Sequence, residues 1–79
     1  MKANVYITLK RDVLDPQGDA VRKALGSLGF AGVRAARVGK LVELDIDEKD
    51  AHGAEHELRA MCEKLLANPV IEDFRFEIV

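Results

Sequence analysis

Two histidines and a glutamate stand at a spacing that could hold a metal ion. The run His52-Gly53-Ala54-Glu55-His56 places two imidazoles four residues apart, so on a helix both would point the same way. The glutamate would then serve as the general base of a zinc hydrolase. A catalytic zinc also needs a third protein ligand and a cleft, and Gly53 weakens the helix. The pattern therefore favours two exposed histidines in a helix's first turn over a metal site.

The single cysteine is a second candidate for chemistry. Cys62 lies between Met61 and Leu65 in an apolar stripe, where the charged thiolate would be costly. We therefore expect a buried, inert thiol and no nucleophile.

Glycines recur every third residue near the middle of the chain, at Gly26, Gly29 and Gly32. A phosphate-binding loop needs backbone N–H groups at the start of a helix, whereas these glycines follow one. We therefore interpret Gly29 as a helix cap and the residues after it as a turn.

Charge and aromatic content disfavour nucleic acid as a partner. The chain carries 12 basic and 14 acidic residues, a net charge of −2, and 5% aromatic residues. Tyr6 and Arg75 could begin an RNA-stacking face, but such faces use two or three aromatic residues. Glu43 and Asp45 would lie near them and repel phosphate. We expect no nucleic-acid binding.

Length and composition indicate one globular domain, residues 1–79. No apolar run approaches the ~20 residues of a membrane span, and no signal-peptide pattern opens the chain. One cysteine cannot form an internal disulfide, which fits a cytoplasmic protein.

Surface scaling predicts roughly 4,700 Å² exposed in a compact fold and about 7,900 Å² buried. That burial stabilises by on the order of 120 kcal/mol, and chain ordering costs about as much, so self-association is expected.

Apolar periodicity predicts the order βαββαβ. Alternation predicts strands at 4–10, 33–38, 41–47 and 70–78. Helical spacing follows the Asp15-Pro16 start and again fills residues 54–65, before the Asn68-Pro69 stop. Two helices on one face of a four-stranded antiparallel sheet would bury every apolar stripe, so the expected fold class is α+β, ferredoxin-like. Gly39-Lys40 would form the tight hairpin turn between the middle strands.

Three segments are candidates for contact with a partner. Asp15 caps the first helix, but Gly18 within it costs about 1 kcal/mol relative to Ala, so close approach of another group is expected there. The expected hairpin tip carries basic side chains that could meet an acidic surface. The candidate residues are Asp15, Pro16, Gln17, Gly18, Arg37, Gly39, Lys40, Leu41, Asn68 and Pro69. No catalytic, cofactor-binding or metal-ligating residue is expected.

Three runs of the sequence carry a family resemblance: residues 13–21, which contain VLDPQG and AV, residues 38–44, which contain VGK and EL, and residues 61–74, MCEKLLANPVIEDF. Together they resemble the PurS family, the small subunit of phosphoribosylformylglycinamidine synthase. The resemblance covers nearly the whole chain and is weakest over residues 47–57.

The resemblance implies a subunit without catalytic residues that forms a homodimer or tetramer. It would bridge a PurL-type synthetase subunit and a PurQ-type glutaminase subunit in purine biosynthesis and support ammonia transfer between them. ATP and Mg²⁺ would belong to the synthetase, and no cofactor to this subunit.

Two other functions use a fold of this kind. An ACT-like module would bind a small regulatory ligand such as an amino acid, and ligand-induced stabilisation would reveal it. An acylphosphatase-like enzyme would need an anion-binding loop with an arginine. Arg11 stands near the right place, but Asp12 and Asp15 would oppose phosphate.

Overall fold

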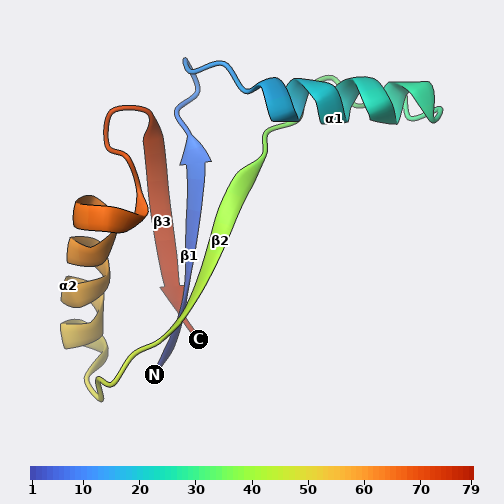
Figure 1. Ribbon diagram of the computed structural model, residues 1–79. Helices are drawn as coiled ribbons and strands as arrows, with labels where there is room; N and C mark the ends of the chain where they lie inside the picture. The colour runs from blue at the N-terminus through green and yellow to red at the C-terminus, as the bar shows by residue number, and fades with distance from the viewer.

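The computed structural model describes residues 1–79, which form one antiparallel sheet and two helices (Figure 1). Strand β1 (Lys2–Leu9) is central, with β2 (Gly39–Asp45) on one side and β3 (Glu72–Ile78) on the other. Both neighbours pair antiparallel to β1. The sheet is therefore three strands wide, with free edges at β2 and β3.

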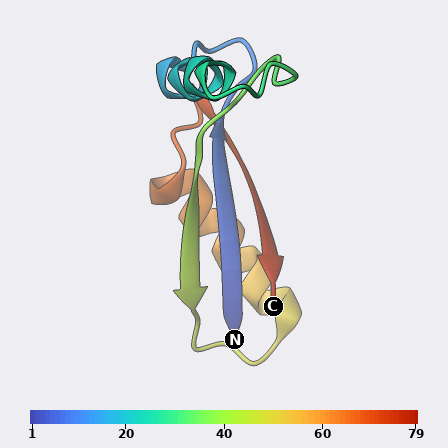
Figure 2. The ribbon, with the colours of Figure 1, turned by 90° about the vertical axis from the view of Figure 1, so that its right-hand side faces the viewer.

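The two helices lie in very different places (Figures 1 and 2). Helix α2 (Ala51–Met61) runs across one face of the sheet and continues into a π-helical turn, Cys62–Leu66. Helix α1 (Pro16–Ser27) projects sideways from one end of the sheet. Neither helix is long and apolar enough to cross a membrane.

Strand register divides the sheet into two faces, as the alternation of apolar residues predicts. Val5 pairs with Val42 on one side and Phe76 on the other, so these side chains share the face toward α2. Tyr6 pairs with Leu41 and Arg75, which share the opposite face. Apolar and polar residues that alternate along each strand therefore lie on opposite faces of the sheet.

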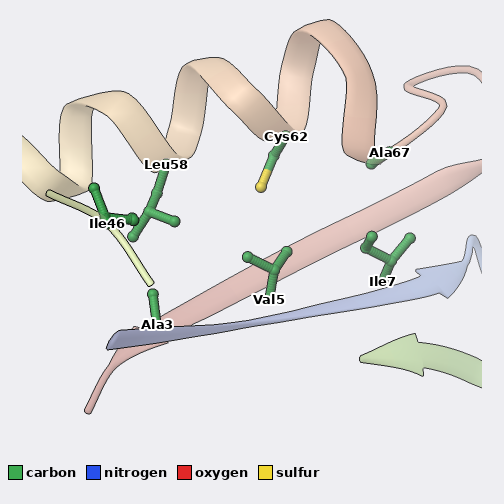
Figure 3. Packing of buried hydrophobic residues seen from close by; sticks show 7 residues of the cluster. All are labelled: Ala3, Val5, Ile7, Ile46, Leu58, Cys62 and Ala67. Atoms are coloured by element: carbon green, nitrogen blue, oxygen red, sulfur yellow. The ribbon is translucent and has the colours of Figure 1, made fainter. Parts of the chain in front are cut away.

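The core lies between β1 and α2 (Figure 3). Leu58 and Cys62, four residues apart on the helix, are fully buried against the strand residues Val5 and Ile7. Fully burying side chains of this size contributes about 1.5–3 kcal/mol each. The buried cluster consists of Ala3, Val5, Ile7, Ile46, Leu58, Cys62 and Ala67.

The α+β class is confirmed, but the predicted fourth strand is wrong, because the sheet has three strands. Residues 33–38 form no strand; they return from α1 toward β2 without a neighbouring strand to pair with (Figure 1). Alternation of apolar residues therefore overpredicted this segment, because a strand also requires a pairing partner. Helix α1 does not pack on the sheet beside α2.

The predicted hairpin turn at Gly39-Lys40 is also wrong. These residues are the first two of β2 and pair with Thr8 and Ile7. Gly39 has no positive φ, so the turn argument for glycine does not apply. A Cβ at Gly39 would stand 2.6 Å from the carbonyl oxygen of Ile7, so close strand pairing explains the glycine.

Helix ends agree well with the sequence. Gly29 follows α1 with φ of +99°, and Phe30 N–H donates to the Leu25 carbonyl oxygen at 2.9 Å, as in a Schellman cap. The second helix stops before Asn68-Pro69, as predicted. The π-helical turn just before it, closed by Ala67 N–H on the Cys62 carbonyl oxygen at 3.0 Å, was not predicted.

Candidate functional site

The three predicted contact segments, far apart in the sequence, meet at one end of the sheet. The start of α1, the start of β2 and the turn before β3 all lie where β1 ends, at the top of Figure 1. We call this region the junction, formed by residues 10–18, 36–41 and 68–73. The sequence indicated the three segments separately, and the sheet register brings them together.

Asp15 ties two of these segments together. Its Oδ1 accepts the N–H of Gly18 at 2.9 Å, the expected cap of α1. Its Oδ2 accepts the N–H of Val38 at 2.8 Å, just before β2. These hydrogen bonds from Gly18 and then Val38 lower the pKa of Asp15 below its ordinary value, because they favour the carboxylate.

Gly18 is buried because another stretch of backbone crosses it. A Cβ at this position would overlap the carbonyl oxygen of Ala36. The close approach expected at Gly18 is therefore confirmed, and the group that approaches belongs to the same chain. Pro16 and Gln17, the neighbouring candidates, are exposed in the first turn of α1.

The Arg37 side chain makes its hydrogen bonds within the junction. Its Nη2 donates to the carbonyl oxygens of Lys10 at 2.7 Å and Val13 at 3.1 Å, and more weakly to that of Leu9 at 3.4 Å. The guanidinium thereby holds the β1–α1 loop in place. Its charge stays at the surface, but its position is set by these carbonyls rather than by a partner.

Lys40 and Lys10 connect the turn before β3 to the rest of the junction. Lys40 Nζ lies 3.4 Å from Glu72 Oε2, and Lys10 Nζ lies 2.9 Å from Asp73 Oδ1. Both lysines remain accessible, so each ion pair contributes about 0–1 kcal/mol. Leu41, the remaining candidate of β2, is 52% exposed on the outer sheet face.

The turn before β3 exposes apolar side chains beside the candidate pair Asn68 and Pro69. Asn68 Oδ1 accepts the N–H of Val70 at 3.0 Å, which shapes the turn locally. Val70 is 77% exposed and Leu65, on the π-helical turn, is 82% exposed. The alternation of apolar residues predicted Val70 in a strand and not as an exposed turn residue. The preceding proline, which delays the start of the strand, was the available signal.

A cavity of about 420 Å³ opens beside the start of α1. Its charged lining consists of Arg11, Asp12, Asp15, Asp19 and Arg37. Three carboxylates and two guanidiniums line the cavity, and the Arg37 guanidinium already donates hydrogen bonds to three carbonyl oxygens. This lining disfavours an acyl phosphate, in agreement with the objection raised from the sequence.

The residues considered for metal binding and for nucleophilic chemistry lie outside the junction. His52, Glu55 and His56 are exposed on α2, and no group of three potential ligands gathers anywhere in residues 1–79. Cys62 is fully buried against β1, as expected (Figure 3). Burial raises the pKa of its thiol, because the thiolate would lose its hydration.

Polar side chains on the outer sheet face are paired with one another. The Tyr6 hydroxyl donates to Glu77 Oε1 at 2.7 Å, and the Arg75 guanidinium lies 4.0 Å from the centre of the Tyr6 ring. The hydrogen bond from Tyr6 lowers the pKa of Glu77 and raises that of the tyrosine. With Arg75 over its ring, Tyr6 is not a free platform for stacking a base.

Comparison with known proteins gives one consistent result. The family model PurS, Phosphoribosylformylglycinamidine (FGAM) synthase, matches residues 2–79. Phosphoribosylformylglycinamidine synthase subunit PurS of Bacillus subtilis is 49% identical over 77 residues, covering 98% of this chain and 90% of the relative.

Solved structures agree. PurS of Methanocaldococcus jannaschii, one of the subunits of formylglycinamide ribonucleotide amidotransferase in the purine biosynthetic pathway, is 39% identical with a TM-score of 0.86. That match covers 96% of this chain and 92% of the other. A chain of the PurLQS structure from Thermotoga maritima is 26% identical with a TM-score of 0.90, covering 99% and 95%.

Proposed function

The chain belongs to the PurS family and is a subunit of phosphoribosylformylglycinamidine synthase, and we propose that it acts there as a non-catalytic bridge between the PurL-type synthetase and the PurQ-type glutaminase. The match over residues 2–79 and the similarity to a chain of the T. maritima PurLQS structure support this role.

The observation that carries the proposal is the junction. One end of the sheet presents charged and apolar groups from three segments on a framework held by Asp15 and Arg37. Loops fixed by a rigid scaffold are typical of binding surfaces. Lys40, Leu41 and Pro69 are exposed there, and we assign them to contact with the partner subunits.

Ammonia chemistry supplies a reason for a bridging subunit. Ammonia released from glutamine is mostly protonated in neutral water, and ammonium is not a nucleophile. A closed assembly keeps ammonia neutral and fixes the distance between the glutaminase and synthetase sites. A subunit that positions the other two can therefore raise the glutamine-driven rate without touching either substrate.

The remaining parts of the proposal follow from the same role. The subunit functions as a homo-oligomer in the cytoplasm. ATP and Mg²⁺ act in the synthetase subunit, and this chain holds no cofactor of its own.

The decisive experiment measures formation of formylglycinamidine ribonucleotide by the matching synthetase and glutaminase, with and without this protein. With glutamine as the nitrogen source, the rate should depend on this protein. With added ammonia it should not, because no transfer between subunits is needed. A glutamine-driven rate that is the same without this protein would overturn the bridging role; stabilisation by amino acids would then be tested for a ligand-binding module.

A pair of variants tests whether the junction is the contact surface. Lys40→Glu reverses an exposed charge at the junction, and Lys2→Glu makes the same change at the opposite end of the sheet. We expect Lys40→Glu alone to lower the glutamine-driven rate, with the ammonia-driven rate unchanged for both. Equal effects of the two variants would remove the junction from the proposal.

A further inference from the structure

Two histidine side chains on α2 have no partner within the chain. His52 and His56 are exposed in the first half of the helix, at the end of the molecule opposite the junction (Figure 1). His52 uses only its backbone N–H, which donates to Asp50 Oδ1 at 3.2 Å. Neither imidazole forms an ion pair or a hydrogen bond. Both imidazoles are therefore available to a ligand from solution.

The helix places the two imidazoles side by side. At about 100° per residue, positions four apart differ by about 40° around the axis, and their Cβ atoms lie about 5–6 Å from each other. Ala54 and Leu58 are fully buried on the opposite side of the helix, so the histidines face solvent. Zinc hydrolases use this helical spacing to hold two ligands of their metal ion. His52 and His56 can therefore bind one ion together.

The helix that carries the pair is held firmly on the sheet. Leu58 and Cys62 pack against β1 (Figure 3), and Asp50 caps the first turn of α2. The backbone between the two histidines is therefore ordered before any ion binds. When one imidazole has bound an ion, the second is already close to it, so the second bond forms at a high effective concentration.

The charges around the pair suit a cation. The stretch from Asp50 to Leu58 contains three carboxylates and no lysine or arginine. The next cationic side chain along the helix is Arg59, whose guanidinium lies 5.5 Å from the centre of the Phe76 ring and is thereby drawn toward β3. The positive end of the helix dipole disfavours a cation near the start of α2, and the carboxylates offset this repulsion.

We propose that His52 and His56 form a surface site for one divalent transition-metal ion, such as Ni²⁺, Cu²⁺ or Zn²⁺. These ions bind imidazole nitrogen well, whereas Mg²⁺ and Ca²⁺ prefer oxygen ligands. Water fills the other coordination positions, so the site needs neither the third protein ligand nor the cleft of a catalytic zinc centre. The bound ion stabilises the first turn of α2, which Gly53 weakens. This inference does not depend on the bridging role.

Calorimetric titration of the untagged full chain with Ni²⁺ tests the site. His56→Gln leaves one imidazole, and His56→Gln combined with Glu57→His, the spaced variant, keeps two histidines but sets them five residues apart. Five residues correspond to about 140° around the helix, so the two imidazoles of the spaced variant diverge. Both substituted positions are exposed, so neither variant should unfold the chain. We expect the wild type to bind Ni²⁺ about 100-fold more tightly than either variant.

Thermal unfolding gives a second measurement of the same site. An ion that binds the folded helix better than the unfolded chain raises Tm, so Ni²⁺ should raise the Tm of the wild type and leave that of the spaced variant nearly unchanged. Mg²⁺ at the same concentration should raise neither. Equal Ni²⁺ affinity in all three proteins would place the ion elsewhere and overturn the proposal. A wild-type protein that does not bind Ni²⁺ would overturn it as well.

Discussion

Two glycines of α1 should respond in opposite directions to the same substitution. Gly18 and Gly26 both lie within the helix, and Ala is favoured over Gly at such positions by about 1 kcal/mol. At Gly26 nothing lies within 4 Å of the added Cβ, so Gly26→Ala should stabilise by about 0.5–1 kcal/mol.

At Gly18 the same substitution should destabilise the fold, because other groups lie close to the added Cβ. The added Cβ would overlap the Ala36 carbonyl and stand 2.8 Å from Asp15 Oδ2. Neither group can move freely, because Asp15 is bonded to Gly18 and Val38. Overpacking of this kind costs about 1–3 kcal/mol, and a rigid backbone neighbour favours the upper end. After the helix gain is deducted, Gly18→Ala should destabilise by roughly 2 kcal/mol.

Thermal unfolding at one fixed protein concentration measures the difference. The two variants should lie about 3 kcal/mol apart, which corresponds to roughly 12 °C or more in Tm for a chain of this size. Fixed concentration matters because association contributes to the apparent stability. If Gly18→Ala is as stable as Gly26→Ala, the Ala36 carbonyl does not hold the backbone of α1 rigidly at Gly18.

Three other predictions concern the core and the titrating groups. Leu58→Ala should lose about 2–5 kcal/mol in urea unfolding because Leu58 is fully buried, whereas Leu65→Ala, at a position 82% exposed, should change stability by about 0.5 kcal/mol or less. The fold lowers the pKa of Asp15, so the carboxylate stabilises the fold fully above its unfolded pKa near 4, and this stabilisation is lost as the pH falls through the folded pKa. The difference in unfolding free energy between wild type and Asp15→Asn should therefore shrink from pH 7 to pH 3. A difference that stays constant over this range would contradict the prediction. Cys62 should react with a thiol reagent at pH 8 only after denaturation, and rapid reaction of the native protein would show that the thiol is not buried as described.

Local patterns predicted most elements of this fold. The alternation around Val5 and Ile7 placed the central strand and both of its faces correctly. Asp15 and Gly29 bounded the first helix at its true ends, because capping depends on residues within a few positions of one another. Local chemistry of this kind needs no knowledge of distant contacts.

The junction was predicted in parts but not as a whole. Gly18 was recognised as a place where something approaches closely, and the approaching group, the Ala36 carbonyl, lies eighteen residues away. Lys40 was expected at a hairpin tip and instead lies within β2, paired with Glu72 across the sheet. These are long-range facts that spacing in the sequence does not contain.

Residue order and type were enough to specify the helices, the strand faces, the buried cysteine and the resemblance to a family. Only the tertiary structure decided that α1 leaves the sheet and that residues 33–38 have no strand to join. The physical reason is that an apolar stripe indicates that a face is to be buried, but it does not indicate which part of the fold or which other molecule buries it. In this chain the contacts of Asp15, Gly18 and Ala36 hold the start of α1 against the segment that precedes β2.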